Sequence, residues 1–162
     1  MVLKKKKKQT IGRRELVDFP DLDLIDIEAK VDTGAYTSAL HCSNIHETES
    51  NGESIICVEF LDPSHPAYNH RKLKFKNFEL RDIRSSFGDV QERYVIKTRI
   101  RLFNEDIEAE FSLSDRSDMR YPVLIGRSLL RKNFIVDVSK KNISKRTKTK
   151  TKHTASPELP RK

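Results

Sequence analysis

The residues best suited to chemistry are Asp32, Thr33 and Gly34, which follow one another early in the chain. A carboxylate can act as a general acid or base when the chain holds it in a fixed place. Gly34 permits backbone conformations, including positive φ, that other residues resist. The three residues therefore predict a turn that presents one carboxylate to solvent or to a partner.

The element that must position Asp32 is the run before it, residues 25–32, in which apolar and polar residues alternate. This two-residue period is typical of a half-buried strand and puts Asp32 on the polar face, where the strand ends. Residues 44–53 are predicted to be a polar connection with a turn at Asn51-Gly52. Residues 127–132 are predicted to form a single short helix. The remaining predicted strands are residues 10–19, 37–42, 54–61, 90–103, 107–113, 121–126 and 134–138.

A hairpin is predicted in the middle of the chain, with its tip at residues 84–89. Before it, Leu73, Phe75 and Phe78 are expected to point inward. In its far arm and in the next strand, apolar positions alternate with a row of basic side chains and a row of acidic ones, which would pair across the strands at ~0.2–1 kcal/mol each. About nine strands and at most one helix predict an all-β fold, a small closed barrel.

The charge is distributed unevenly along the chain. The net charge is +8, but residues 1–8 hold five lysines and residues 140–162 hold nine basic residues against one acidic residue, which leaves 18 basic and 23 acidic residues between them. The chain is therefore expected to be one acidic domain, residues 10–138, between disordered basic tails, residues 1–9 and 139–162. Such tails bind polyanions weakly and with strong salt dependence. Two cysteines, no apolar segment after the first lysines and no apolar stretch of about 20 residues favour a soluble, cytoplasmic protein.

Three landmarks together resemble a retropepsin, the retroviral type of aspartic protease. They are residues 31–35 around Asp32-Thr33-Gly34, the Gly88 hairpin, and residues 123–130, Val-Leu-Ile-Gly-Arg-Ser-Leu-Leu. The resemblance implies that the late Gly126 segment packs against the Asp-Thr-Gly loop and that the hairpin is a flap over the cleft. Their order and composition make the combination specific, whereas Asp-Thr-Gly alone is a weak signal.

Within that fold, the chain is similar to a bacterial retropepsin-like family over roughly residues 11–138. The motifs that carry this likeness are residues 11–15, 29–35, 37–40, 93–96 and 115–127. The family has been labelled an ATP-dependent zinc protease; its members accompany or are fused to ATP-grasp glutamate ligases, and it includes a peptidase that trims glutamate tails from a ribosomal protein. The likeness thus implies a peptide or protein substrate that is acidic or rich in glutamate, and a functional link to such a ligase. Tyr36 departs from the pattern, since arginine is expected there.

The resemblance also implies roles for individual residues. Asp32, Thr33 and Gly34 would be catalytic, and substrate would contact residues of the loop, the flap hairpin and the segment after Gly126, namely Ala35, Tyr36, Ser86, Gly88, Arg93 and Arg127. Two carboxylates about 3 Å apart share one proton, so that one activates water while the other protonates the scissile carbonyl. Since the chain has one Asp-Thr-Gly, a twofold homodimer would supply the second Asp32.

Several alternatives stay open at this point. Asp32 could only cap a turn, Arg127 could form an ion pair within the domain, and Arg93, Arg116 and Arg120 could line a cleft or form surface ion pairs. A metal site at residues 41–46 is not expected, because neighbouring residues of a strand point to opposite faces and a catalytic zinc needs about three protein ligands. No cofactor is expected, since there is no Gly-rich phosphate loop. The fold could instead serve as a silent binding or dimerisation module, or the tails could attach the chain to ribosomes or nucleic acid.

Overall fold

The computed structural model describes residues 7–84, 87–116 and 120–146. These residues form eleven strands, a 3-10 turn, the α-helix α1 (Arg127–Asn133) and a helical turn over residues 143–146. The strands are β1 (Gln9–Ile11), β2 (Arg14–Phe19), β3 (Leu24–Val31), β4 (Ser38–Ser50), β5 (Glu53–Phe60), β6 (Leu73–Phe75), β7 (Glu79–Arg84), β8 (Val90–Leu102), β9 (Glu105–Ser114), β10 (Val123–Ile125) and β11 (Phe134–Val136). The 3-10 turn, η1 (Pro20–Leu22), follows β2.

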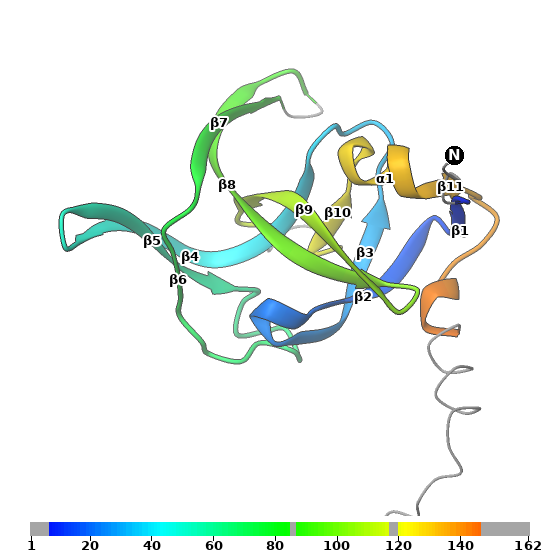
Figure 1. Ribbon diagram of the computed structural model, residues 1–162, viewed down its shortest axis with the longest axis horizontal. Coiled ribbons are helices and arrows are strands. Elements are labelled where there is room, and N and C mark those ends of the chain that lie inside the picture. The colour runs from blue at the N-terminus through cyan, green and yellow to red at the C-terminus, as the bar shows by residue number, and fades with distance from the viewer. Residues whose placement is uncertain (1–6, 85–86, 117–119, 147–162) are drawn as a thin grey trace, which may run out of the picture.

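Six strands close into a ring in the order β10, β3, β2, β8, β9 and β4, because β4 also pairs with β10. The short β10 lies parallel to β3 and antiparallel to β4, so it joins the two strands that flank the Asp-Thr-Gly loop. β4 is in turn parallel to β9, with Ser38 opposite Phe111. Figure 1 shows these strands wrapping around a common centre. The predicted class, an all-β ring with a flap hairpin and one short helix, is confirmed.

The core fills the ring with the apolar faces of the alternating strands. β3 buries Ile27 and Ala29 with the predicted period, but the alternation breaks at Asp26, where φ is 58°, so that Leu24 is buried and Ile25 is 60% exposed. Phe19 packs edge-on against Phe111 with the ring centroids 5.3 Å apart. The charge rows of β8 and β9 lie opposite each other, and Arg101 pairs with Asp106 at 2.7 Å between Nε and Oδ1. The predicted alternation is confirmed for β8 between Ile96 and Leu102 but is lost near the end of β9, where Ser112 is buried between Phe111 and Leu113.

The connection predicted at residues 44–53 is wrong, because β4 continues to Ser50 and pairs with β5 along its whole outer half. Beyond Cys42 the two strands leave the ring as a long hairpin, at the left of Figure 1. The turn at Asn51-Gly52 is confirmed, and both residues have positive φ, 53° and 80°. Polar side chains suit this hairpin because most of them face solvent on both sides.

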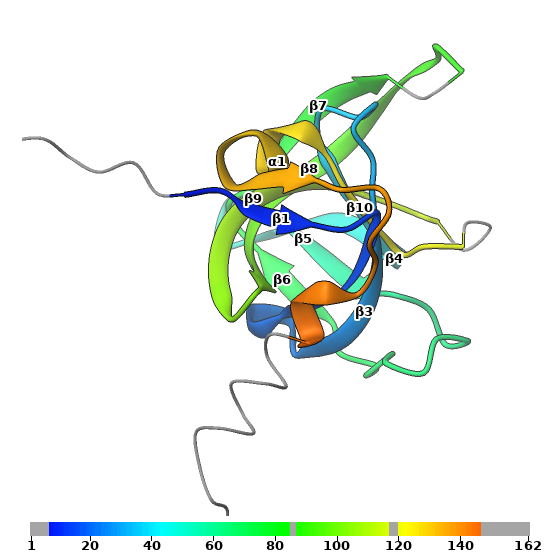
Figure 2. The same ribbon diagram turned by 90° about the vertical axis from the view of Figure 1, so that its right-hand side faces the viewer.

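The segment predicted as the first strand, residues 10–19, is two strands separated by Gly12 and Arg13. The Gly12 N–H donates to the buried Glu15 carboxylate (2.8 Å), and the Arg13 N–H donates to the Lys140 carbonyl (2.8 Å). β1 then pairs in parallel with β11, which brings the two ends of the domain together (Figure 2).

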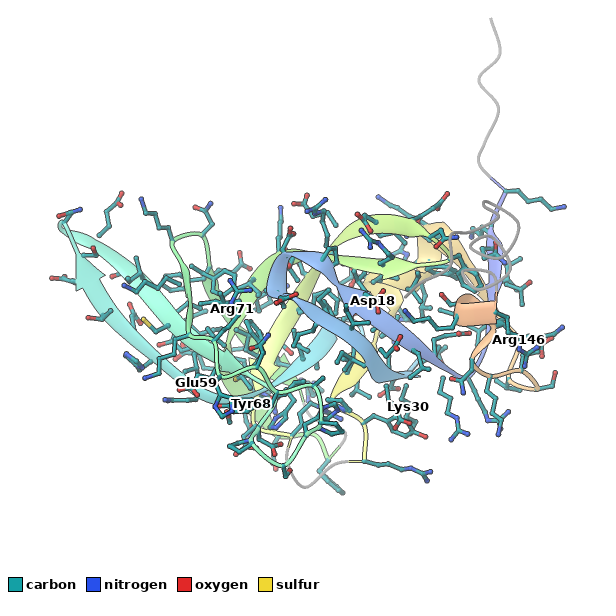
Figure 3. The ribbon with its side chains drawn as sticks, turned by 90° about the horizontal axis from the view of Figure 1, so that it is seen from below. Asp18, Lys30, Glu59, Tyr68, Arg71 and Arg146 are labelled. Carbon is teal, nitrogen blue, oxygen red and sulfur yellow. The ribbon has the colours of Figure 1, made fainter. Side chains whose placement is uncertain are left out.

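The packed chain continues past the boundary predicted at Val138, because residues 139–146 lie against β2. Glu15 accepts the Ser144 N–H (2.9 Å), and Lys145 Nζ lies 2.7 Å from Asp18 Oδ1 and 2.9 Å from Asp26 Oδ1. Figure 3 shows Asp18 on the underside of the molecule and Arg146 in the last described turn. Polar contacts therefore order a segment in which apolar residues are rare.

The long loop after β5 is pinned from both sides. Tyr68 donates its hydroxyl to Glu59 (2.6 Å), side by side with it in Figure 3, and Asn69 donates to the Asp23 carbonyl (3.2 Å). The apolar residues that follow pack at the edge of the core as predicted, namely Leu73, Phe75 and Phe78. No helix within the described ranges has the length and apolar content that crossing a membrane requires.

Candidate active site

The Asp32 loop begins where β3 leaves the ring. The Asp32 N–H donates to the carbonyl of Ile125 at the end of β10 (2.9 Å), which continues the parallel pairing of β10 with β3 by one residue. On the other side of the strand, the preceding Val31 N–H donates to the backbone carbonyl of Arg13, which lies between β1 and β2 (2.9 Å). The backbone that carries the carboxylate is therefore held between two neighbouring segments.

The Asp32 carboxylate closes its own turn. Its Oδ1 accepts the Gly34 N–H (3.0 Å), and its backbone carbonyl accepts the Ala35 N–H (3.2 Å). The side chain is half-buried, and Thr33 and Gly34 are exposed. Gly34 does not have positive φ, which among the described glycines only Gly52 and Gly88 adopt. A Cβ on Gly34 would lie 3.3 Å from Oδ1, so glycine leaves room for the carboxylate here.

The segment after β10 supports the other side of the loop. The N–H groups of Arg127 and Ser128 donate to the carbonyls of Ala35 (2.8 Å) and Tyr36 (2.9 Å), and the Gly126 N–H donates to Ser38 Oγ (2.9 Å). These contacts confirm that the Gly126 segment packs against the Asp-Thr-Gly loop.

Arg127 does not form the ion pair that the sequence left open, within the part of the chain that the structure describes. Its Nη1 donates to the Thr33 carbonyl (2.9 Å), and its guanidinium lies 5.7 Å from the centre of the Tyr36 ring. The ring itself is 53% exposed. Arg127 and Tyr36 thus form a cation–π pair beside the loop.

Arg93 and Arg116 lie within electrostatic range of one another, and Arg116 within range of Asp32. Burial lowers the pKa of Arg116, the neighbouring Arg93 charge lowers it further, and the Asp32 carboxylate opposes both effects. Arg93 comes from β8 and donates to Ser114 Oγ at the end of β9 (3.3 Å). Arg116 Nε donates to the Tyr121 carbonyl (3.2 Å). The structure therefore brings the predicted Arg93 toward the site together with Arg116.

A buried histidine stands behind Arg116. His41 is 2% exposed; its Nδ1 accepts the Arg116 N–H (2.7 Å), and its Nε2 lies 2.7 Å from Asp62 Oδ2. No pattern in the sequence links His41 to Arg116 or Asp62. His41 was considered only as part of an unlikely metal site, and its partners lie 21 and 75 residues away in the sequence.

The predicted flap is the hairpin of β7 and β8, which rises at the same end of the ring as the Asp32 loop (Figures 1 and 2). Gly88 has φ 88°, and its carbonyl accepts a long hydrogen bond from Arg84 (3.4 Å). Phe87 beside it is 90% exposed. Ser86, also predicted to contact substrate, lies outside the described residues.

Residues 41–46 were the weak metal candidate in the sequence. Burial raises the pKa of the Cys42 thiol to about 12, and a protonated thiol is a poor metal ligand. Within residues 7–84, 87–116 and 120–146, no three His, Cys, Asp or Glu side chains are grouped as ligands for a metal ion.

Comparison with known proteins places this site in a family. The model of the RimB-like family, described as retropepsin-like aspartic endopeptidase RimB, matches residues 10–147. A crystal structure of a protein of unknown function (DUF785) from Legionella pneumophila superposes with a TM-score of 0.65 at 22% identity, covering 85% of this chain and 99% of that one, which shows a shared fold.

Two curated relatives are named probable alpha-L-glutamate ligase. The one from Shewanella halifaxensis is 37% identical over 133 residues, and the one from Desulfotalea psychrophila is 32% identical over 134; in each case the match covers 80% of this chain and 28% of the ligase. The chain thus spans just over a quarter of the length of these relatives. The family match covers nearly the whole described domain, including the Asp32 loop and its support, and the chain belongs to the RimB-like family of retropepsin-like aspartic endopeptidases.

Proposed function

We propose that the chain is an aspartic peptidase in which Asp32 activates water to hydrolyse a peptide bond. The observation that carries this proposal is the locked Asp32 loop. Two segments hold its backbone, the Asp32 N–H donates to Ile125, and the carboxylate is half-buried beside the exposed Thr33 and Gly34. A carboxylate fixed in this way is suited to general acid–base catalysis.

The second carboxylate comes from a second copy of the chain. Two Asp32 side chains about 3 Å apart share one proton, so one accepts a proton from water while the other protonates the scissile carbonyl. The hydroxide attacks the carbonyl carbon, the tetrahedral intermediate breaks its C–N bond, and the leaving nitrogen takes a proton. A twofold axis through the loops would generate this pair from one sequence. Thr33 and Gly34 shape the loop, and Ala35 and Tyr36 lie where a substrate backbone would pass.

The proposed substrate is an acidic peptide, such as a glutamate tail. The relatives that contain this domain are named as glutamate ligases, and a peptidase acting on the product of such a ligase fits that arrangement. The arginines around the loop, Arg93, Arg116 and Arg127, favour an anionic substrate. The flap residue Gly88 would cover it.

The activity test is mass spectrometry of a glutamate-tailed peptide incubated with the full chain. Asp32→Asn and Asp32→Ala should abolish cleavage, whereas Asp23→Asn, an Asp-to-Asn change at an exposed residue just before β3, should not. A chelator should leave the rate unchanged. Chelator-sensitive cleavage that survives in Asp32→Ala would refute the mechanism.

The shared site has its own test. Wild-type chain and Asp32→Asn are mixed in varying proportions at a fixed total concentration, and the subunits are allowed to exchange. If each site needs two Asp32 residues, total activity falls as the square of the wild-type fraction. A linear fall would show that one chain is sufficient.

A further inference from the structure

Arg116, within electrostatic range of Asp32, and its neighbour Arg93 lack a counter-ion in direct contact among the described residues. Apart from Asp32 itself, which acts on Arg116 at longer range, no described carboxylate lies within 4 Å of Arg93 or Arg116. Arg116 is half-buried, so its charge is only partly solvated. Holding a second cation near it is unfavourable unless an anion binds between them.

Arg116 is held so that part of its guanidinium remains free for a ligand. Its Nε donates to the Tyr121 carbonyl (3.2 Å), which leaves the two terminal nitrogens as donors. Its backbone N–H is fixed by the buried His41. A guanidinium fork matches the geometry of a carboxylate, which can accept two parallel hydrogen bonds.

The His41–Asp62 pair fixes the position of Arg116. Since the Arg116 N–H donates to Nδ1, the ring proton of neutral His41 is on Nε2, which donates to Asp62 Oδ2 (2.7 Å). Asp62 Oδ1 in turn accepts the Ser64 N–H (2.8 Å). A chain of hydrogen bonds therefore runs from the loop after β5 to the backbone of Arg116.

We propose that Arg116, with Arg93 beside it, forms the subsite that binds a side-chain carboxylate of the substrate next to the scissile bond, and that His41 and Asp62 are its positioning residues. This proposal rests on the proposed function for the location of the scissile bond. It assigns the preference for acidic peptides to the loop after β9 and to β8. Tyr36 and Arg127 beside the Asp32 loop then need not supply that selectivity.

Binding is measured first, without catalysis. In the full-length Asp32→Asn chain, the affinity for dye-labelled tetraglutamate and tetraglutamine is followed by fluorescence anisotropy. Tetraglutamate should bind more tightly, and adding Arg116→Gln should weaken it by on the order of tenfold or more, as expected for a charge-assisted pair. Tetraglutamine binding should change little. Arg131→Gln, an exposed arginine on α1, is the matched control and should change neither.

The positioning role of His41 and Asp62 is tested by measuring hydrolysis, in chains that keep the wild-type Asp32. Asp62→Asn should raise KM for a Glu-containing substrate while leaving the Gln-containing analogue and kcat nearly unchanged. His41→Asn keeps an acceptor for the Arg116 N–H and should retain more of the Glu preference than His41→Leu. Thermal melts identify any variant that does not fold, and Asp62→Asn, at a partly exposed residue, provides a second test if the His41 variants do not.

The outcomes separate this proposal from the proposed function. Equal loss of Glu and Gln peptides in Arg116→Gln would overturn the subsite and make Arg116 a partner of Asp32 alone. Equal hydrolysis of the Glu and Gln substrates by the wild type would also overturn the subsite, but it would leave the proposed peptidase function standing. Selective tetraglutamate binding that depends on Arg116, without hydrolysis of either peptide, would support the subsite and count against the peptidase.

Discussion

Gly126→Ala tests whether the segment after β10 holds the Asp32 loop in place. Gly126 has φ −95° and ψ 177°, which alanine adopts without strain, so the effect of the substitution comes from space alone. A Cβ there would lie 2.8 Å from the Tyr36 carbonyl oxygen, 2.9 Å from the Thr37 carbonyl carbon and 3.0 Å from the Ala35 carbonyl oxygen. All three are backbone atoms of the loop, so they cannot rotate away as a side chain would.

The expected cost is that of overpacking, about 1–3 kcal/mol in the free energy of unfolding. For a domain of this size, that corresponds to a fall in Tm of roughly 3–10 °C. Activity should fall further than stability does, because the displaced carbonyls accept the Arg127 and Ser128 N–H groups that anchor the loop. A displacement approaching 1 Å at a catalytic group can cost on the order of a hundredfold in rate.

The assay combines a thermal melt with kcat on a glutamate-tailed peptide, measured well below the Tm of the variant. The control is Gly52→Ala in the β4–β5 turn, where φ is 80° and a Cβ would meet nothing within 4 Å. It should cost about 1–2 kcal/mol through backbone strain alone and leave kcat unchanged. A Gly126→Ala chain with wild-type Tm and kcat would refute the reasoning, as would equal loss of kcat in both variants.

Two further predictions concern stability. A hydrogen bond from the Ser64 hydroxyl, and then the contact with His41, lower the pKa of Asp62 to about 2, below its usual value in an unfolded chain. This stabilisation is present above about pH 4 and is lost as the pH falls toward 2. In Asp62→Asn, the free energy of unfolding, measured with urea, should therefore fall less steeply as the pH is lowered from about 4 toward 2. Lys145→Ala should cost on the order of 2–3 kcal/mol in the same assay, because it removes a charged partner from the buried Asp18.

Each has a control. Asp23→Asn changes an exposed carboxylate and should leave the acid limb steep, so an equal flattening there would contradict the role given to Asp62. Lys132→Ala, on the exposed face of α1, should change the free energy of unfolding by less than about 0.5 kcal/mol. Equal losses in the two lysine variants would mean that the Lys145 contact does not stabilise the domain.

The fold was predictable from the sequence wherever burial imposes a period. β3, β8 and β9 each have one face in the core, so their alternation predicted both the strands and the orientation of Asp32 at the end of β3. The outer half of β4 has no such period, because it leaves the core and is stabilised by hydrogen bonds to β5. A paired strand with solvent on both faces has the same polar composition as a loop, so its sequence predicts a connection.

The C-terminal segment shows a second limit of sequence patterns. Residues 139–146 have little apolar content, but their polar groups meet Glu15 and Asp18, which are buried on β2. In a linear sequence, a buried carboxylate on a strand and a distant lysine cannot be matched. Sequence patterns therefore do not predict a segment that is ordered by specific polar contacts, whereas they do predict segments that are ordered by hydrophobic burial.

The candidate site also has one part that the sequence predicts and one part that it does not. The Asp32 loop and its Gly126 support were predicted because their residue types and order form a specific motif. Arg116 was one of several arginines that could line a cleft or pair at the surface, and its backbone is held by His41, 75 residues earlier. Contacts of that kind depend on the three-dimensional path of the chain.

The support of the Asp32 loop by β10 and α1 also has a consequence for the order of folding during synthesis. The partners of this loop, Ile125 and Arg127, leave the ribosome more than 90 residues after Asp32 itself, and β1 waits still longer for β11. Non-local pairings of this kind close large loops and form late. A nascent chain would carry Asp32 through the synthesis of more than 90 further residues without the loop geometry on which the proposed activity depends, so that activity would begin only once the domain is complete.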